Sequence, residues 1–379
     1  MAKGIVLARL TVFDKDFKMY EGIKELFENL NADGHKIIVI SHTYGHLKIM
    51  EKIFRESFGF EVTCTYRRTI REKVNEGNAS RYILVGSSDD DLILAANKKM
   101  LIINPGWSVI QETKPARYGI TLERPEQLFE AIRLIDNQNR WYFQLEVDQA
   151  TNVLALTSAN TFNRDETEVT ILKGFERLLK SGDRRYFNTL YFHLISGVMK
   201  SNELKKVDIW GIFPSSSGEI NNELEELKER CRYLTGKQRS QPLFIRHTIV
   251  NKSRNTDHQV RLEKGCTKHF DSIKLNPYYS KKIKGNVVCV IDDYITNGIS
   301  FETARNLLLK AGASRIILIA LGRYKKGVNG IYQYENYNLI GDISETDYQY
   351  KFKKREHLIG EYDEGARDEI NRMYEILNG

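Results

Sequence analysis

The sequence predicts an α/β protein built from two doubly wound domains, each with a parallel sheet covered by helices. Short apolar runs of strand length alternate with longer runs that place apolar residues at helical spacing, which is typical of strand–helix–strand units. The run 287–291 is apolar at every position, as expected for a strand buried on both faces. The chain has 379 residues, 41% of them hydrophobic, which is enough for two or three domains with substantial cores.

Residues 1–136 are expected to form the first domain. Strands are predicted over 4–10, 36–40, 82–85 and 101–104, and helices over 18–30, 47–57, 92–98 and 126–135. The polar segment 137–140 is the predicted link to the second domain.

Residues 141–338 are expected to form the second domain. Strands are predicted over 141–147, 207–213, 287–291 and 314–322, and helices over 168–180, 184–201, 223–234 and 301–311, with Gly312 as the last C-cap. The segment 325–337 is typical of a loop or hairpin. Residues 339–379 are predicted to be a helical extension. Its helix over 363–377 has one apolar face. We expect this face to pack on one of three surfaces: its own domain, another copy of the chain or a different protein.

The segment 287–300 carries the most informative polar residues. Asp292 and Asp293 follow the apolar strand, and the turn Thr296-Asn297-Gly298-Ile299-Ser300 precedes a helix. A helix start preceded by small residues leaves backbone N–H groups free to hold a phosphate. Adjacent carboxylates suit the vicinal hydroxyls of a ribose. The segment therefore predicts a site for a ribose 5-phosphate, and the plain alternative is a buried strand with a solvated acidic end.

This pattern, four apolar residues followed by Asp-Asp-x-apolar-Thr-x-Gly-x-Ser, resembles the phosphoribosyl pyrophosphate (PRPP) signature of type I phosphoribosyltransferases. Asn297 stands where a Thr is more often found. The resemblance implies that Asp292 and Asp293 are catalytic and hold the ribose hydroxyls, directly or through an Mg²⁺ that PRPP carries. It also implies that the turn 296–300 binds the 5-phosphate of PRPP.

Two further segments extend the resemblance. The loop Ser215-Ser216-Ser217-Gly218 follows a predicted strand and can present N–H groups to an anion. In the family, the loop at this place contacts pyrophosphate; otherwise it is a Ser-rich surface turn. Residues 252–262 are similar to the Arg-x-Arg-x-Thr-x-x-Gln-x-x-Leu element of the ComF-type branch, with Lys252 for the first Arg and Arg254 for the second. This implies a catalytic Arg254 that closes over the leaving pyrophosphate, with Lys252 also binding PRPP.

Each of these segments has a second interpretation. The segment 252–262 is otherwise a solvated basic loop that could touch nucleic acid. Arg323 follows the predicted strand 314–322 at its carboxyl end, where it is a candidate for substrate binding or for the surface.

The first domain resembles the haloacid dehalogenase (HAD) superfamily. Ser41 matches its second motif, Lys73 is the candidate for its third-motif lysine, and 86–91 resembles its fourth motif with Asp91 in the last position. The first motif places Asp-x-Asp after the first strand, but here the residues are Ala8-Arg9-Leu10. Since neither Ala nor Leu can be a nucleophile or a metal ligand, the resemblance implies a HAD-like fold without phosphatase activity. The carboxylates of 89–91 form a weak Mg²⁺ site or cap the next helix, and we favour the cap.

Composition narrows the function classes. The net charge of +7 suits anionic substrates as well as nucleic acid, but basic residues are dispersed, which disfavours nucleic acid as a partner. No apolar run reaches membrane-span length, and the opening residues, interrupted by Arg9, do not form a signal peptide. The four cysteines show no CxxC spacing, so we expect reduced thiols, no zinc and a cytoplasmic protein.

The sequence thus favours a phosphoribosyltransferase that uses PRPP and Mg²⁺ to form or break an N-glycosidic bond of a nucleobase or nucleotide. The domain combination resembles fusions found in bacterial stress and defence gene neighbourhoods, an association only. The main alternative is a PRPP- or nucleotide-binding regulator without turnover, and an active phosphatase and an RNA-binding protein rank lower. Nothing in the sequence specifies the acceptor base.

Overall fold

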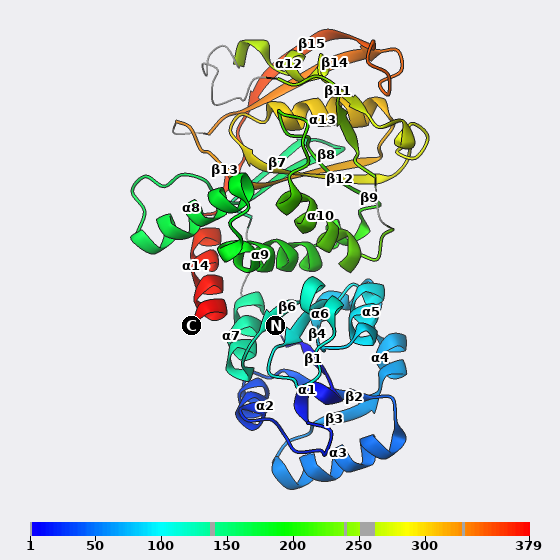
Figure 1. The fold of residues 1–379 in the computed structure, drawn as a ribbon, viewed down its shortest axis with the longest axis vertical. Coiled ribbons are helices and arrows are strands. Elements are labelled where there is room, and N and C mark those ends of the chain that lie inside the picture. Colours follow the sequence, from blue (N-terminus) through cyan, green and yellow to red (C-terminus); the bar gives the residue numbers. More distant parts are fainter. Residues whose placement is uncertain (1, 137–140, 239–240, 251–261, 328–329) are drawn as a thin grey trace.

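A computed structural model describes almost the whole chain, as residues 2–136, 141–238, 241–250, 262–327 and 330–379. It shows two α/β parts, one above the other along the long axis of the molecule (Figure 1). The first part contains a six-stranded sheet in the order β3-β2-β1-β4-β5-β6. All of its strand pairs are parallel, as predicted. The strands are β1 (Gly4–Ala8), β2 (Lys36–Ser41), β3 (Thr63–Tyr66), β4 (Tyr82–Val85), β5 (Leu101–Pro105) and β6 (Ile120–Leu122).

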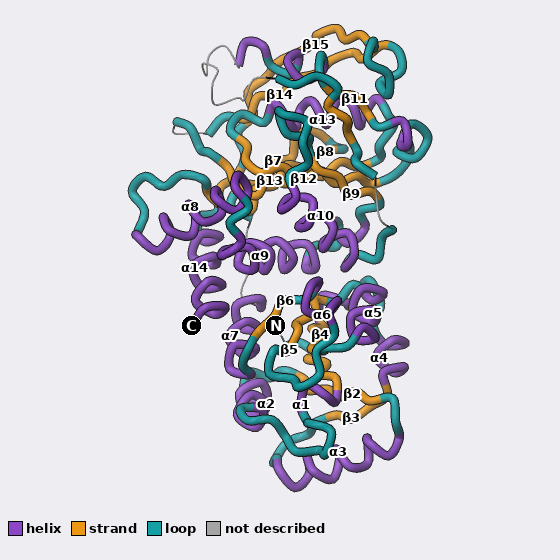
Figure 2. Tube along the Cα trace, viewed as in Figure 1, coloured by secondary structure: helices purple, strands orange, loops and turns teal. Residues whose placement is uncertain are grey.

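Helices surround this sheet and bury it (Figure 2). Every residue of β1 is buried, which is the expected state of a central strand in a parallel sheet. The helices are α1 (Arg9–Val12), α2 (Ile23–Ala32), α3 (Tyr44–Ser57), α4 (Arg67–Lys73), α5 (Asp89–Lys98), α6 (Thr113–Tyr118) and α7 (Pro125–Asp136). Short 3₁₀ helices occur over Ala79–Arg81, Arg184–Tyr186, Leu204–Lys206 and Pro277–Tyr279.

The second sheet is mixed, so the prediction of a wholly parallel second sheet is wrong. Its order is β16-β7-β8-β13-β12-β9, in which β8, β13, β12 and β9 are parallel while β7 and β16 are antiparallel to their neighbours. Only two residues separate β7 from β8, and a turn that short can join only antiparallel strands. The strands are β7 (Phe143–Asp148), β8 (Thr151–Ser158), β9 (Ile209–Ile212), β12 (Val287–Ile295), β13 (Arg315–Arg323) and β16 (Glu361–Tyr362).

Two antiparallel strand pairs and further helices complete the second part. The pairs are β10 (Phe244–Arg246) with β11 (Ile273–Leu275), and β14 (Tyr332–Ile340) with β15 (Gln349–Leu358). The helices are α8 (Glu166–Ser181), α9 (Phe187–Lys200), α10 (Asn222–Leu234), α12 (Thr267–Phe270), α13 (Ile299–Lys310) and α14 (Gly365–Asn378). Gly312 has a φ of +84° and lies one residue beyond the C-cap of α13, which is Ala311.

The segment 339–379 differs from the predicted helical extension. It contains β15 and β16 before α14, and β16 pairs with β7 of the second sheet. The predicted helix exists as α14, but its apolar residues Ile370 and Met373 are buried by the chain itself. The helix packs on α9, α8, β8 and α7. The buried residues of this face therefore join the two parts of one chain.

The two parts share one hydrophobic core at their contact, where α9 and α10 of the second part face α5 and α6 of the first (Figure 1). The rings of Tyr118 and Tyr233 stack across this contact with 4.1 Å between their centroids. Gln127 of α7 donates through Nε2 to the carbonyl oxygen of Ile376 in α14, at 2.8 Å. None of the helices in the described parts of the chain has the length and apolarity needed to cross a membrane.

Candidate functional site

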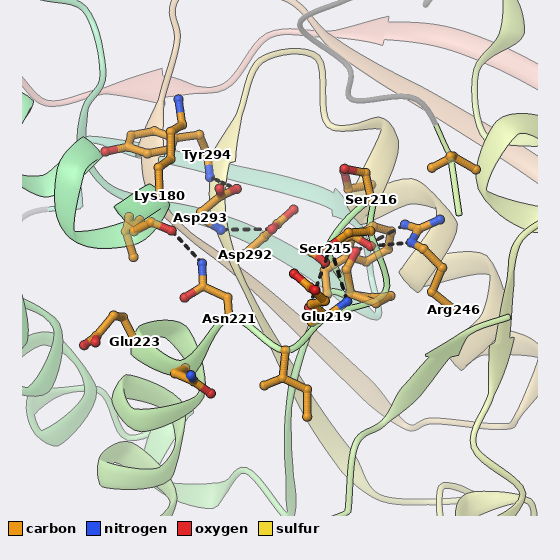
Figure 3. Close-up of a pocket in the computed structure, with 18 of the residues that line it drawn as sticks. Lys180, Ser215, Ser216, Glu219, Asn221, Glu223, Arg246, Asp292, Asp293 and Tyr294 are labelled. Carbon is orange, nitrogen blue, oxygen red and sulfur yellow. Dashed lines mark hydrogen bonds between the residues drawn. The ribbon is translucent and has the colours of Figure 1, made fainter. Parts of the chain in front are cut away.

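A cavity of about 710 Å³ lies at the carboxyl ends of β9 and β12 (Figure 3). Ligands in open α/β sheets bind outside the carboxyl ends of the strands. The cavity walls include several predicted site residues, which are Asp292, Asp293, Ser215, Ser216, Ser217 and Ser300. Residues separated by about 80 positions in the sequence therefore lie around one space.

Asp292 and Asp293 are part of β12 itself, which runs four residues farther than predicted because β13 continues to pair with it. The N–H of Asp293 donates to Asp292 Oδ1 at 2.9 Å, and the N–H of Tyr294 donates to Asp293 Oδ1 at 2.6 Å. Burial raises the pKa of Asp292 well above its ordinary value, and the charge of Asp293 adds to this rise. Burial also raises the pKa of Asp293. The pair is a poorly solvated acceptor that hydroxyl donors or a cation would stabilise.

The loop after β9 is held in shape by its own serines. Ser215 Oγ donates to the carbonyl oxygen of Glu219 at 2.7 Å and lies 3.0 Å from Ser217 Oγ. Gly218 adopts a φ of +81° and its N–H donates to the carbonyl oxygen of Ser215 at 3.2 Å. Gly218 shapes the loop but does not line the cavity. The three serines do line it, so this loop forms part of the cavity wall.

Arg246, at the end of β10, holds this loop through hydrogen bonds. The sequence analysis did not identify it as a site residue. Its guanidinium donates to the carbonyl oxygens of Ser215 and Pro214, the latter at 3.2 Å, and to Ser272 Oγ at 2.8 Å. Burial lowers the pKa of Arg246 to about 10, and Asp292 opposes this shift. No local motif marks this arginine in the sequence, because its partners lie about 30 residues away on either side.

The opposite end of the cavity is formed by the end of α8 and the start of α10. Lys180 Nζ lies 5.7 Å from the centroid of the Tyr294 ring and 2.5 Å from Glu176 Oε1, and its charge lowers the pKa of Asp293 against the effect of burial. Asn221 caps α10 by accepting from the N–H of Leu224 at 3.1 Å. Figure 3 shows the two carboxylates between Lys180 on one side and Arg246 on the other. The cavity thus has cations at both ends and acids in the middle.

The predicted phosphate turn contributes to the cavity only through Ser300. Thr296, Asn297, Gly298 and Ile299 do not line it. Ile299 is the first residue of α13, and the other three precede that helix. Gly298 is the N-cap of α13 with a φ of +82°, and a Cβ there would lie 2.0 Å from a Tyr332 ring carbon. The conformation of this turn therefore requires glycine.

The predicted basic loop lies outside the residues that the structure describes. Lys252 and Arg254 lie in 251–261, outside the described residues. The residues on either side of this segment form hydrogen bonds. The N–H of Val250 donates to the carbonyl oxygen of Ser216 at 3.0 Å, and Gln333 Nε2 donates to the carbonyl oxygen of Leu262 at 2.9 Å.

Arg323 has a structural position, which contradicts both the substrate-binding and the surface interpretation. It is fully buried and does not line the cavity. Its Nε donates to the Tyr362 hydroxyl at 2.7 Å and its Nη2 to the carbonyl oxygen of Gly330 at 2.6 Å. Its guanidinium also lies 3.7 Å from the centroid of the Phe143 ring. Arg323 therefore fixes β16 and the segment before β14 to the second sheet.

In the first part, Lys73, the candidate for the third-motif lysine, is exposed in the last turn of α4. Arg67, at the start of the same helix, is buried instead and lies 2.5 Å from Asp91 Oδ1. Ser88 and Asp91 form a reciprocal capping box at the start of α5, which confirms the predicted cap. Ser41 ends β2, and its hydroxyl lies 3.2 Å from His46 Nδ1.

Among the described residues, no three His, Cys, Asp or Glu side chains lie together in a way that could hold a metal ion. Asp292 and Asp293 offer two carboxylates. Mg²⁺ commonly takes one or two carboxylates together with substrate phosphates, so this pair fits an Mg²⁺ that arrives with a phosphorylated ligand. Comparison of the sequence with protein-family models and with curated proteins finds no match.

Proposed function

We propose that the second part of the chain is a type I phosphoribosyltransferase domain, similar to the ComF branch, that uses PRPP. The observation that supports this most directly is the cavity that brings Asp292 and Asp293 together with Ser215–Ser217. Ribose hydroxyls need close acceptors, and a pyrophosphate needs N–H and hydroxyl donors with a nearby cation. The cavity walls offer the two carboxylates and the serine hydroxyls, with Arg246 as a cation beside the serine loop.

In this proposal, the ribose of PRPP lies over the carboxylate pair and its pyrophosphate lies against the serine loop. Burial raises the pKa of both acids, so the hydroxyl donors of a ribose would restore interactions that burial removed. When bound with PRPP, Mg²⁺ neutralises charge on the pyrophosphate as it leaves. The bond between ribose C1 and pyrophosphate breaks, and a nitrogen of a nucleobase or nucleotide bonds to C1, so the protein mainly positions and stabilises charge.

For the first part, we propose a HAD-like domain that has lost phosphatase activity. Ala8 and Leu10 supply no nucleophile and no metal ligand at the end of β1 and the start of α1. Asp91 is already committed to the buried ion pair with Arg67 and to the cap of α5. These contacts support a structural role for the acids that remain.

The test is pyrophosphate release from PRPP with Mg²⁺ across a panel of nucleobases and nucleotides. We expect release that depends on one acceptor and that the double variant Asp292→Asn/Asp293→Asn abolishes. Asp347→Asn, at an exposed residue of the loop before β15, is the matched control and should behave as wild type. PRPP binding without release for any acceptor would favour the regulator alternative, and no PRPP binding at all would contradict the proposal.

A further inference from the structure

A buried group of polar side chains joins the start of α13 to strand β14, and the function proposed above gives it no role. Glu302, in the first turn of α13, is buried, and so are Arg305 of the same helix and Glu335 of β14. Arg305 Nη2 and Asn306 Nδ2 donate to the carbonyl oxygen of Glu335, at 2.7 and 2.9 Å. Burial of charged groups is costly unless they are paired, and here their pairing fixes where β14 lies on α13.

Tyr332, the first residue of β14, reaches from this group to the turn before α13. Its side chain is fully buried, and its ring packs so closely on Gly298 that a Cβ at that glycine would overlap the ring carbons. The hydroxyl of Tyr332 donates to Glu302 Oε1 at 2.7 Å. Next along the strand, the N–H of Gln333 donates to the carbonyl oxygen of Asn297 at 2.8 Å. The start of β14 therefore contacts both the turn before α13 and the first turn of that helix.

The Tyr332 hydroxyl orients the carboxylate of Glu302. Glu302 Oε2 accepts from Arg305 Nε at 2.9 Å and from the N–H of Glu335 at 3.0 Å, and Tyr332 supplies a donor to the other oxygen. Burial raises the pKa of Tyr332 well above its ordinary value, and the charge of Glu302 adds to this rise, so the hydroxyl keeps its proton and remains a donor. A carboxylate in a first helical turn otherwise competes for the N–H groups at the helix N-terminus, which attract anions. These donors keep the carboxylate turned toward β14.

We propose that Tyr332 is a positioning residue for the 5-phosphate of PRPP, because it holds the turn 296–300 in shape and keeps Glu302 away from the N–H groups that the phosphate would use. This inference rests on the proposed function, with the 5-phosphate at the helix start that the sequence predicts for it. Ser300, the second residue of α13, lines the cavity that holds the carboxylate pair, so this helix start lies beside the proposed ribose site. Tyr332 itself does not line the cavity, so it acts on the ligand through the turn.

The experiment compares two ligands of the full chain by calorimetric titration. Ribose 5-phosphate reports on the helix start, and Mg²⁺-pyrophosphate reports on the serine loop. Tyr332→Phe removes only the hydroxyl, and it should weaken ribose 5-phosphate binding about 5- to 10-fold while the Mg²⁺-pyrophosphate affinity stays within about twofold of wild type. Tyr332→Leu also removes the ring from Gly298 and should weaken ribose 5-phosphate binding further. Tyr337→Phe is the matched control, since Tyr337 is a buried tyrosine whose hydroxyl donates to Glu335 Oε2 within β14.

A second readout separates positioning from a general loss of structure. In the pyrophosphate-release assay, Tyr332→Phe should raise KM for PRPP with little change in kcat, since the lost contact supports binding of a group remote from the bond that breaks. An equal loss of affinity for both ligands, or an equal loss with Tyr337→Phe, would overturn the inference. Unchanged ribose 5-phosphate affinity in both Tyr332 variants would overturn it while leaving the proposed function intact. If wild type binds Mg²⁺-pyrophosphate but not ribose 5-phosphate, this inference alone fails. If wild type binds neither of these ligands nor PRPP, the proposed function fails and this inference fails with it.

Discussion

Substitution of Arg246 should lower both the free energy of unfolding and the affinity for Mg²⁺-pyrophosphate. Its guanidinium joins the serine loop after β9 to Ser272, which follows α12, through hydrogen bonds to Ser215, Pro214 and Ser272. Arg246→Met keeps much of the apolar stem but removes the charge and every donor. Arg246→Lys keeps the charge but cannot reproduce the planar fork that reaches three acceptors.

The size of the effect follows from these contacts. A hydrogen bond from a charged donor contributes about 1.5–3 kcal/mol. The three bonds share one side chain and their acceptors lie near the cavity, where water reaches, so their contributions do not simply add. We expect Arg246→Met to lower the free energy of unfolding by about 3 kcal/mol. Loss of the charge should also weaken Mg²⁺-pyrophosphate binding at least about tenfold, equivalent to about 1.4 kcal/mol.

Urea unfolding followed by circular dichroism measures the first effect, and calorimetric titration measures the second. Arg246→Lys should lose stability but retain more of the pyrophosphate affinity than Arg246→Met. Arg68→Met removes an exposed arginine whose partner is Glu72 one turn away, and it should change neither quantity measurably. If Arg246→Met unfolds within about 0.5 kcal/mol of wild type and binds pyrophosphate equally well, the role assigned to Arg246 is refuted.

Two further predictions concern buried charges. The pKa of Asp292 is higher in the folded protein than in the unfolded chain. The unfolded chain therefore releases this proton first, and the free energy of unfolding falls as pH rises above about 4. Asp292→Asn should therefore be more stable than wild type at pH 7, by on the order of 1 kcal/mol, and the difference should vanish below about pH 4 in urea unfolding. Arg67→Met leaves the buried Asp91 unpaired and should cost about 3–5 kcal/mol, while Lys73→Met should have no measurable effect.

Each of these has a clear contrary result. An Asp292→Asn protein that is less stable than wild type at pH 7 would show that the ionised carboxylate has a stabilising partner. An Arg67→Met protein with an unchanged urea midpoint would show that the ion pair with Asp91 contributes little. If Lys73→Met lowered the free energy of unfolding as much as Arg67→Met does, Lys73 would contribute to the stability of the first part as much as Arg67.

Much of the secondary structure follows from local patterns. The strand predicted over 82–85 coincides with β4, and the helix predicted over 223–234 differs from α10 by one residue. Apolar runs and caps act within a few residues, so the sequence displays them directly. The strand β8 was not predicted, and its two-residue turn to β7 made the second sheet mixed. That turn contains no Gly or Pro to mark it, so the antiparallel pair left little local signal.

The residues of the candidate site also fall into those that the sequence predicted and those that only the tertiary structure revealed. Asp292, Asp293 and Ser215–Ser217 could be predicted because each belongs to a short pattern of strand, polar turn and helix, and these residues do line one cavity. Arg246 and His269 also line this cavity but belong to no such pattern. Arg246 takes its hydrogen-bond partners from a serine loop about 30 positions away. The pKa of His269 is lowered by burial and by the neighbouring charges of Arg246 and Lys268. Long-range packing sets those conditions, since desolvation and electrostatic coupling depend on distance in space and not on separation along the chain.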